Sequence, residues 1–186
     1  SQIDLSNPVV QKLYTNFNTG ILINYDSTKD FAYAASSDIE ASIWGKVEIP
    51  MMKKNYVDAS NSVPAENKAA YDAYVVQGIN FIDNTLFKYF KPNTKIAKLM
   101  PNKVLLSNNI QASNTITGIN GNVLIESESR YNSSSANGQR AVFNAHSIVF
   151  QVNKDEISNV SNLTKFTKDN FYILFSRIIG MHNLVN

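Results

Sequence analysis

The sequence DNFYILFSRIIGMHNLVN, residues 169–186, predicts an amphipathic helix at the end of the chain. Its apolar side chains and one histidine recur at the spacing of a single helix face: Phe171, Leu174, Phe175, Ile178, His182 and Val185. The chain has one other histidine, His146. A histidine on a buried helix is a typical zinc ligand in hydrolases. The residues around His182 therefore decide whether this helix carries a metal site, the remnant of one, or no site.

A longer helix is predicted at residues 64–90. Pro64 suits the first turn of a helix, and Lys91-Pro92-Asn93 suits its end. The apolar residues between them repeat every three or four positions: Tyr71, Val75, Ile79, Ile82, Leu86 and Phe90. Gly78 in the middle costs about 1 kcal/mol relative to alanine. We therefore expect Gly78 to allow a close contact between this helix and a sheet.

Several short stretches rich in apolar and β-branched residues predict strands. They are residues 20–26, 42–49, 103–107, 119–125, 141–143 and 147–152. The fourth contains Asn120-Gly121, a pair typical of a hairpin turn. The connecting segments 27–39, 108–118 and 153–166 are expected to be loops.

The caps of the first and last helices are also predictable. Pro8 fits the first turn of a helix that runs to about Phe17, with Ser6 or Asn7 as its cap. Thr167 is expected to cap the last helix.

Strands and helices are partly segregated along the chain, which favours an α+β fold over a doubly wound one. The expected architecture is a mixed β-sheet packed against the long helix (64–90) and the C-terminal helix (167–186). No internal repeat or linker divides the sequence, so a single domain is predicted over residues 1–186.

Composition excludes several classes of protein. The formal net charge is +2 and the lysines are scattered, so no strong field for nucleic acid or an anionic membrane is expected. The absence of cysteine excludes disulfides, thiolate metal sites and a cysteine nucleophile. No apolar run reaches the roughly 18 residues of a membrane span. The chain begins with Ser1 rather than methionine, so we expect a mature form whose export signal or lipidated cysteine lies upstream.

The order of these segments resembles that of the zinc metallohydrolase-like, zincin-type lipoproteins encoded beside starch-utilisation-type nutrient importers in Bacteroidetes. The resemblance covers residues 13–182 and lies in the order and local character of the segments. They are the early strand ending Tyr25-Asp26, the helix end 86–90, the segments 101–107 and 148–152, and the histidine-bearing helix. The resemblance implies a zincin-like fold and an exported, lipid-anchored protein in the periplasm or at the cell surface.

Zincins of this kind carry His-Glu-x-x-His on a helix, where two histidines bind one zinc and the glutamate acts as general base. If His182 is the first histidine, Asn183 takes the place of the base and Asn186 that of the second ligand. If His182 is the second, Ile179 and Ile178 take those places. Neither an amide nor isoleucine accepts a proton from water near neutral pH. The resemblance therefore implies a degenerate zincin scaffold with no catalytic residue in this sequence, or the N-terminal half of a larger zincin.

The two histidines are the candidate metal ligands. Catalytic zinc sites use three protein ligands, so a lone His182 is more often a half-buried residue hydrogen-bonded to a backbone carbonyl. His146 would join His182 if its strand runs beside the last helix, with Asp155 or Glu156 as the carboxylate. The commoner fate of His146 is a polar residue at a strand end. No cofactor is expected, and zinc at His182 is the alternative.

The other chemically notable residues have commoner structural roles. Glu126 and Glu128 share one face of an extended segment, where paired carboxylates can bind calcium but more often form a solvated strand edge. Asp26, Asp30 and Asp38 are expected to form turns.

The only tryptophan, Trp44, lies with Tyr33 and Tyr56 in a loop-rich region. Exposed aromatic rings there would stack on a sugar or hold a peptide. Burial in the core is the commoner fate of such residues.

Two functions from different classes are open. The first is a non-catalytic, pseudo-metallopeptidase-like surface lipoprotein that binds a glycan or peptide, or assists an outer-membrane importer complex. The alternative is a zinc-dependent metallohydrolase, a peptidase, whose remaining motif residues lie outside this chain. The missing glutamate favours the first. No nucleic acid partner is expected, the membrane is reached only through the upstream lipid anchor, and a dimer would cover the apolar end of the last helix.

Overall fold

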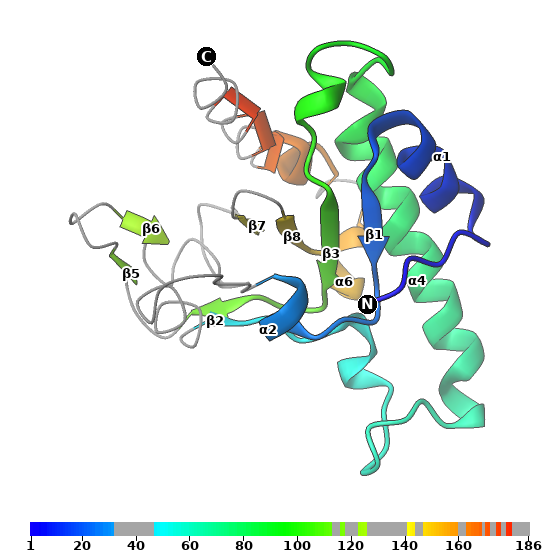
Figure 1. The fold of residues 1–186 in the computed structure, drawn as a ribbon. Helices are drawn as coiled ribbons and strands as arrows, with labels where there is room; N and C mark the ends of the chain where they lie inside the picture. Colours follow the sequence, from blue (N-terminus) through cyan, green and yellow to red (C-terminus); the bar gives the residue numbers. More distant parts are fainter. Residues whose placement is uncertain are drawn as a thin grey trace.

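The computed structural model describes residues 1–31, 47–112, 116–117, 123–125, 141–143, 147–159, 163–168, 170–171, 174–175 and 178–179. Its centre is a four-stranded sheet in the order β1-β3-β8-β7 (Figure 1). The strands are β1 (Gly20–Leu22), β3 (Lys103–Ser107), β8 (Ser147–Gln151) and β7 (Ala141–Phe143). β1, β3 and β8 run parallel, and β7 pairs antiparallel with β8 at the edge. The sheet is therefore mixed, as the sequence predicts.

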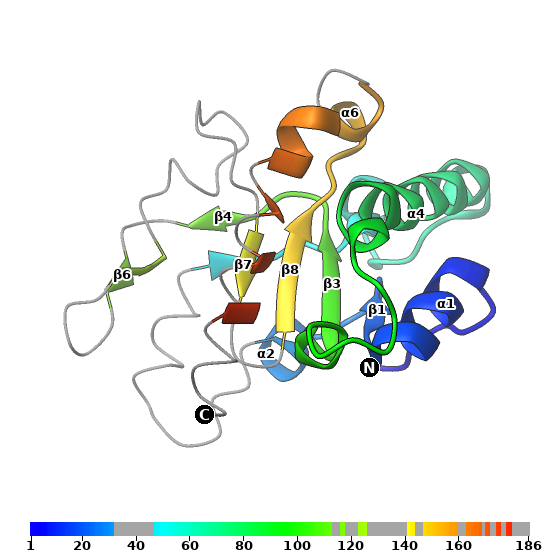
Figure 2. The same ribbon diagram turned by 90° about the horizontal axis from the view of Figure 1, so that it is seen from above.

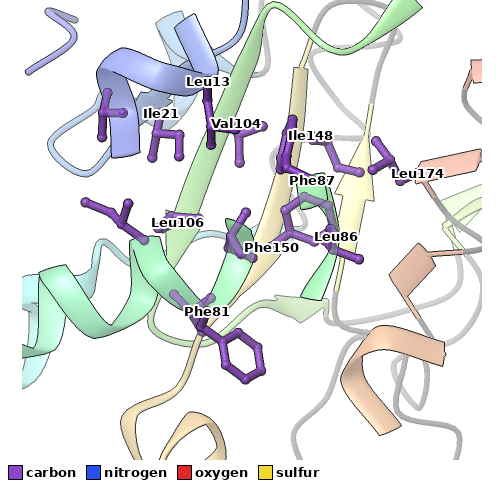
Figure 3. Packing of buried hydrophobic residues seen from close by; sticks show 14 of the residues in the cluster. Leu13, Ile21, Phe81, Leu86, Phe87, Val104, Leu106, Ile148, Phe150 and Leu174 are labelled. Carbon is purple, nitrogen blue, oxygen red and sulfur yellow. The ribbon is translucent and has the colours of Figure 1, made fainter. Parts of the chain in front are cut away.

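Helices cover one face of this sheet. They are α1 (Pro8–Phe17), α4 (Ala65–Thr85) and the helical residues of 163–179, here named the C-terminal helix. Figures 1 and 2 show α1 and α4 on the β1 side and the C-terminal helix, orange to red, on the β8 side. One apolar cluster joins all three to the sheet, through Leu13, Ile82 and Leu174 among others (Figure 3). This segregation of layers makes the fold α+β.

The opposite face of the sheet has a smaller core. Leu22, Leu105 and Val149 point to it because side chains alternate along a strand. They pack against Tyr25, Phe31 and Ile110, which come from connecting segments.

The connecting segments also contain short helical elements. Two of these are short α-helices, α2 (Ser27–Asp30) and α6 (Lys154–Ile157). Three are 3-10 turns, η1 (Met52–Asn55), η2 (Phe87–Tyr89) and η3 (Ala97–Leu99).

The first helix forms as predicted. Asn7 is the cap, because its side-chain oxygen accepts hydrogen bonds from the backbone N–H groups of Val9 and Val10. The helix ends at Phe17, where Asn18 adopts a left-handed conformation with φ of 54°.

The ends of the other two helices differ from the prediction. α4 stops at Thr85 rather than at residue 90, and the apolar pattern continues into the 3-10 turn η2. The last helix already includes residue 163, so Thr167 is not its cap; the Thr167 hydroxyl donates to the Leu163 carbonyl one turn earlier. Apolar periodicity therefore located both helices but not their ends.

The predicted loops contain unpredicted structure. Residues 27–39 and 153–166 hold α2 and α6, and the segment 108–118 contributes two short strands. β4 (Gln111–Ala112) pairs with β2 (Val47–Glu48), and β5 (Ile116–Thr117) pairs with β6 (Val123–Ile125). β2 and β6 lie within the predicted strands 42–49 and 119–125. β4 and β5 are two residues long, too short to leave an apolar alternation in the sequence.

Gly78 confirms the expected close contact. A Cβ atom at Gly78 would lie 2.8 Å from Cε of Met52 and 3.6 Å from a methyl carbon of Val152, just past β8. α4 thus approaches η1 and the end of β8 at the one point where it carries no side chain.

Candidate binding groove

Most residues singled out from the sequence lie outside the described part of the chain. They are His146, His182, Asn183, Asn186, Glu126, Glu128, Asp38, Trp44 and Tyr33. Within the described residues, no three His, Asp or Glu side chains gather as a metal ion would require. The described residues alone therefore do not assemble a zinc site.

Asp155 and Glu156 are described and have structural surroundings. Both lie in the first turn of α6, whose cap Asn153 accepts a hydrogen bond from the Asp155 backbone N–H. Glu156 accepts a 3.5 Å hydrogen bond from the side-chain amide of Gln151, which is fully buried at the end of β8. The side-chain amide oxygen of Gln151 in turn accepts a hydrogen bond from the backbone N–H of Ile110. This chain of hydrogen bonds joins α6, β8 and the segment after β3.

Asp30 is not the solvated turn residue expected from the sequence. Its side chain is buried, with only 4% of the residue exposed. Its carboxylate accepts hydrogen bonds from the Ser1 ammonium and hydroxyl and from the Asp26 backbone N–H, and Lys103 Nζ lies 3.5 Å away. Burial acts to raise the pKa of Asp30, but these hydrogen bonds and the ammonium charge outweigh it and lower the pKa to about 2. Asp26, in contrast, is exposed, as a turn residue should be.

Tyr56 is part of the packed interior rather than an exposed platform. Its ring centroid lies 5.6 Å from that of Tyr71 and 5.8 Å from that of Tyr74. The Tyr74 hydroxyl donates a 2.6 Å hydrogen bond to the Val152 carbonyl, and burial raises the pKa of Tyr74. Of the aromatic group noted in the sequence, the described member is therefore structural.

The open depression that could take a ligand lies along the outer side of α4. Its volume is about 680 Å³, within the roughly 300–1,000 Å³ range of ligand sites. Its lining comes from α4 and from the start of the C-terminal helix: Asp72, Ala73, Val76, Gln77, Asn80, Phe81, Asn84 and Leu163. We name this depression the α4 groove.

The α4 groove combines a row of amides with an apolar floor. Gln77, Asn80 and Asn84 are spaced three and four residues apart, so they share one face of the helix over two turns. Phe81 and Leu163 supply apolar surface beside them. Phe81 is held in place by an edge-on contact with Phe166, at 4.7 Å between ring centroids.

The groove carries little free charge. Its one carboxylate, Asp72, is already paired with Lys68 at 2.7 Å, an exposed contact one turn apart on α4. Gln77 lies 3.5 Å from the hydroxyl of Ser158, which ties one end of the row to the residues after α6. The lining offers donors and acceptors without a nucleophile next to a base, so it can bind but has no evident means of catalysis.

Sequence reasoning missed these amides because they stand on the polar side of a helix whose apolar side defined the prediction. The buried residues of α4 pack into the core, with Phe81 at the border between the core and the groove. The others are Tyr74, Gly78, Ile79, Ile82 and Thr85. The spacing of Gln77, Asn80 and Asn84 was visible, but exposed amides on a helix are common. Only the nearby Leu163, almost eighty residues later, makes their surface concave.

Comparison with known proteins adds no relative. No protein-family model matches the chain, and neither a curated protein nor a solved structure gives a match. No helix within the described ranges is long and apolar enough to cross a membrane. The fold and groove define a mixed α+β domain with a candidate ligand site on its long helix.

Proposed function

We propose that this chain is a non-catalytic binding protein on a zincin-like α+β scaffold, and that the α4 groove holds an uncharged polar chain, a glycan or a peptide. The observation that carries the proposal is the amide row of Gln77, Asn80 and Asn84 beside apolar Phe81 and Leu163. By its resemblance, the protein would be exported and lipid-anchored at the periplasmic or outer surface, where it would assist a nutrient importer.

The chemistry of amides supports this class of ligand. Each side-chain amide both donates and accepts, as sugar hydroxyls and peptide groups do, so one row can pair with either. A charged ligand would find the carboxylate of Asp72 already neutralised by Lys68. The apolar floor would bury the CH faces of a sugar or a small peptide side chain.

The layer order supports the zincin-like scaffold. A long helix, α4, and the C-terminal helix lie on the same face of a mixed sheet. The antiparallel strand β7 forms the edge of that sheet beyond β8. A mixed sheet with two helices on one face is compatible with the scaffold that the family resemblance implies.

The groove is tested by ligand titration of two variants. Neutral oligosaccharides such as maltoheptaose, and a mixture of short peptides, are titrated into the protein by calorimetry. Replacing both Asn80 and Asn84 with alanine is expected to weaken binding of whichever ligand binds about 30-fold, because each lost hydrogen bond costs about 1 kcal/mol.

The matched control replaces two exposed amides outside the groove, Gln11 and Asn55, with alanine. We expect this variant to bind like the original protein. Alanine favours helix more than asparagine does, so the groove variant should remain folded. Equal affinity of the groove variant and the original protein, or no binding of either ligand class, would refute the proposal.

A further inference from the structure

A second surface combines exposed apolar side chains with exposed lysines. It comprises the segment after α4, with η2 and η3, and the outer side of the C-terminal helix. Figure 1 shows these two parts side by side at the top of the molecule, in bright green and in orange to red. Its residues are Lys88, Tyr89, Lys91, Lys95, Ile96, Lys98, Lys168, Phe171, Phe175 and Ile179. We name it the lysine–aromatic face.

The apolar part of this face is exposed and ordered by ring contacts. Tyr89, Ile96 and Ile179 are 56%, 42% and 46% exposed, and Phe175 is 38% exposed. The Phe171 ring stacks on Phe175 at 6.1 Å and meets Tyr89 edge-on at 5.9 Å. When large apolar side chains gather in an exposed patch, the patch commonly marks an interaction site.

All charged side chains among the described residues of this face are positive. Between Asp83 and Glu126 the sequence has five lysines and no acidic residue. Lys88, Lys91, Lys95 and Lys98 are exposed, and none forms an ion pair with a described carboxylate. Lys88 instead lies over the Tyr89 ring, 5.1 Å from its centroid. The overall charge of +2 therefore hides a local concentration of cations.

Lys168 extends this pattern onto the C-terminal helix. It precedes Phe171 and Phe175 by three and seven residues, so all three lie on one side of the helix. Leu174 and Ile178 lie on the neighbouring side of the helix, in the core, and Phe171 packs against the same core. The exposed edge of this apolar face therefore carries Phe175 and Ile179, with Lys168 about two to three turns before them.

We propose that the lysine–aromatic face binds the surface of a membrane that contains anionic phospholipids. Lysine ammonium groups at such a surface are attracted to phosphate, by about 1 kcal/mol each, which is about fivefold in affinity. Tyrosine is favoured at the headgroup level, and isoleucine and phenylalanine insert into the acyl boundary.

Charge complementarity and apolar contact favour a membrane surface over a second copy of the chain or a nucleic acid. A second copy in a symmetric contact would place the lysines of one protomer against those of the other. A nucleic acid backbone would satisfy the lysines but leave Ile96, Phe175 and Ile179 without an apolar partner. The inference is independent of the α4 groove, which lies along α4 itself rather than on the segment after it.

Flotation with lipid vesicles tests this surface. The purified chain is mixed with vesicles of phosphatidylcholine, with or without phosphatidylglycerol, at low and at raised salt. We expect binding only to the anionic vesicles, and weaker binding as salt screens the charges. Changing Lys88, Lys95 and Lys98 to glutamine should lower the partition coefficient about 100-fold, from about fivefold for each lysine.

A matched control removes the same net charge elsewhere. Lys29, Lys54 and Lys68 are exposed on α2, η1 and the start of α4, away from the face. Changing these three to glutamine should leave most of the binding intact. Equal loss in the two triple variants, equal binding to neutral vesicles, or no binding to anionic vesicles would overturn the proposal. A concentration-dependent dimer that Phe175→Ser abolishes, without vesicle binding, would assign the face to a second copy instead.

Discussion

Replacing Phe150 with alanine is expected to lower the free energy of unfolding by about 3–5 kcal/mol. Phe150 is fully buried in β8, paired with Leu106 of β3 on one side and Ala141 of β7 on the other. Its ring faces the helical layer, 6.3 Å from the Phe166 ring centroid (Figure 3). Truncation removes apolar contacts and leaves a cavity between the sheet and two helices, which the surrounding strands cannot close.

Urea unfolding followed by circular dichroism measures this loss. The same substitution at Phe175, which is partly exposed, is the matched control and should cost far less. Phe150 lies where the sheet meets α4 and the C-terminal helix. The loss of stability caused by Phe150→Ala therefore also shows whether these layers form one core. If Phe150→Ala and Phe175→Ala were equally stable, the helical layer would not pack on β8 as described.

Asp30 is expected to stabilise the fold above about pH 4 and to lose that effect in acid. Its folded pKa, about 2, is below the ordinary aspartate value of 3.8. A carboxylate whose pKa is lowered by folding stabilises the folded state at pH values above the unfolded pKa. The difference corresponds to about 2 kcal/mol, which should disappear as the pH falls from about 4 to about 2.

Unfolding by urea at a series of pH values tests this contribution, with Asp30→Asn as the variant. The variant should be less stable by about 2 kcal/mol near neutral pH and should lose less stability in acid. Asp72→Asn, at an exposed carboxylate paired with Lys68, is the control and should change stability little. Parallel pH profiles for the original protein and Asp30→Asn would show that the carboxylate is not held as described.

Features set by local sequence were predictable in this chain. The cap at Asn7, the strand at residues 103–107 and the apolar side of α4 follow from hydrogen bonding and periodicity within a few residues. The α+β class also follows, since it depends on the order of such segments. Gly78 was correctly expected to mark a close contact.

Features made by distant segments were not predictable. Asp30 resembles any turn aspartate until Ser1 and Lys103 are brought to it from other parts of the chain. The strand pair β2–β4 joins segments far apart in the chain through backbone hydrogen bonds that leave no side-chain pattern. The α4 groove needs Leu163, and the lysine–aromatic face needs two segments that are about eighty residues apart.

The central proposal is that this α+β domain binds a ligand without a catalytic metal. The most direct test is elemental analysis of protein purified without chelator and then supplied with zinc, for the original chain and for His182→Ala. We predict no stoichiometric zinc and no difference between the two proteins, because the glutamate and second histidine of His-Glu-x-x-His are missing around His182. One zinc ion per chain that is lost in His182→Ala would contradict the claim and favour a metallohydrolase.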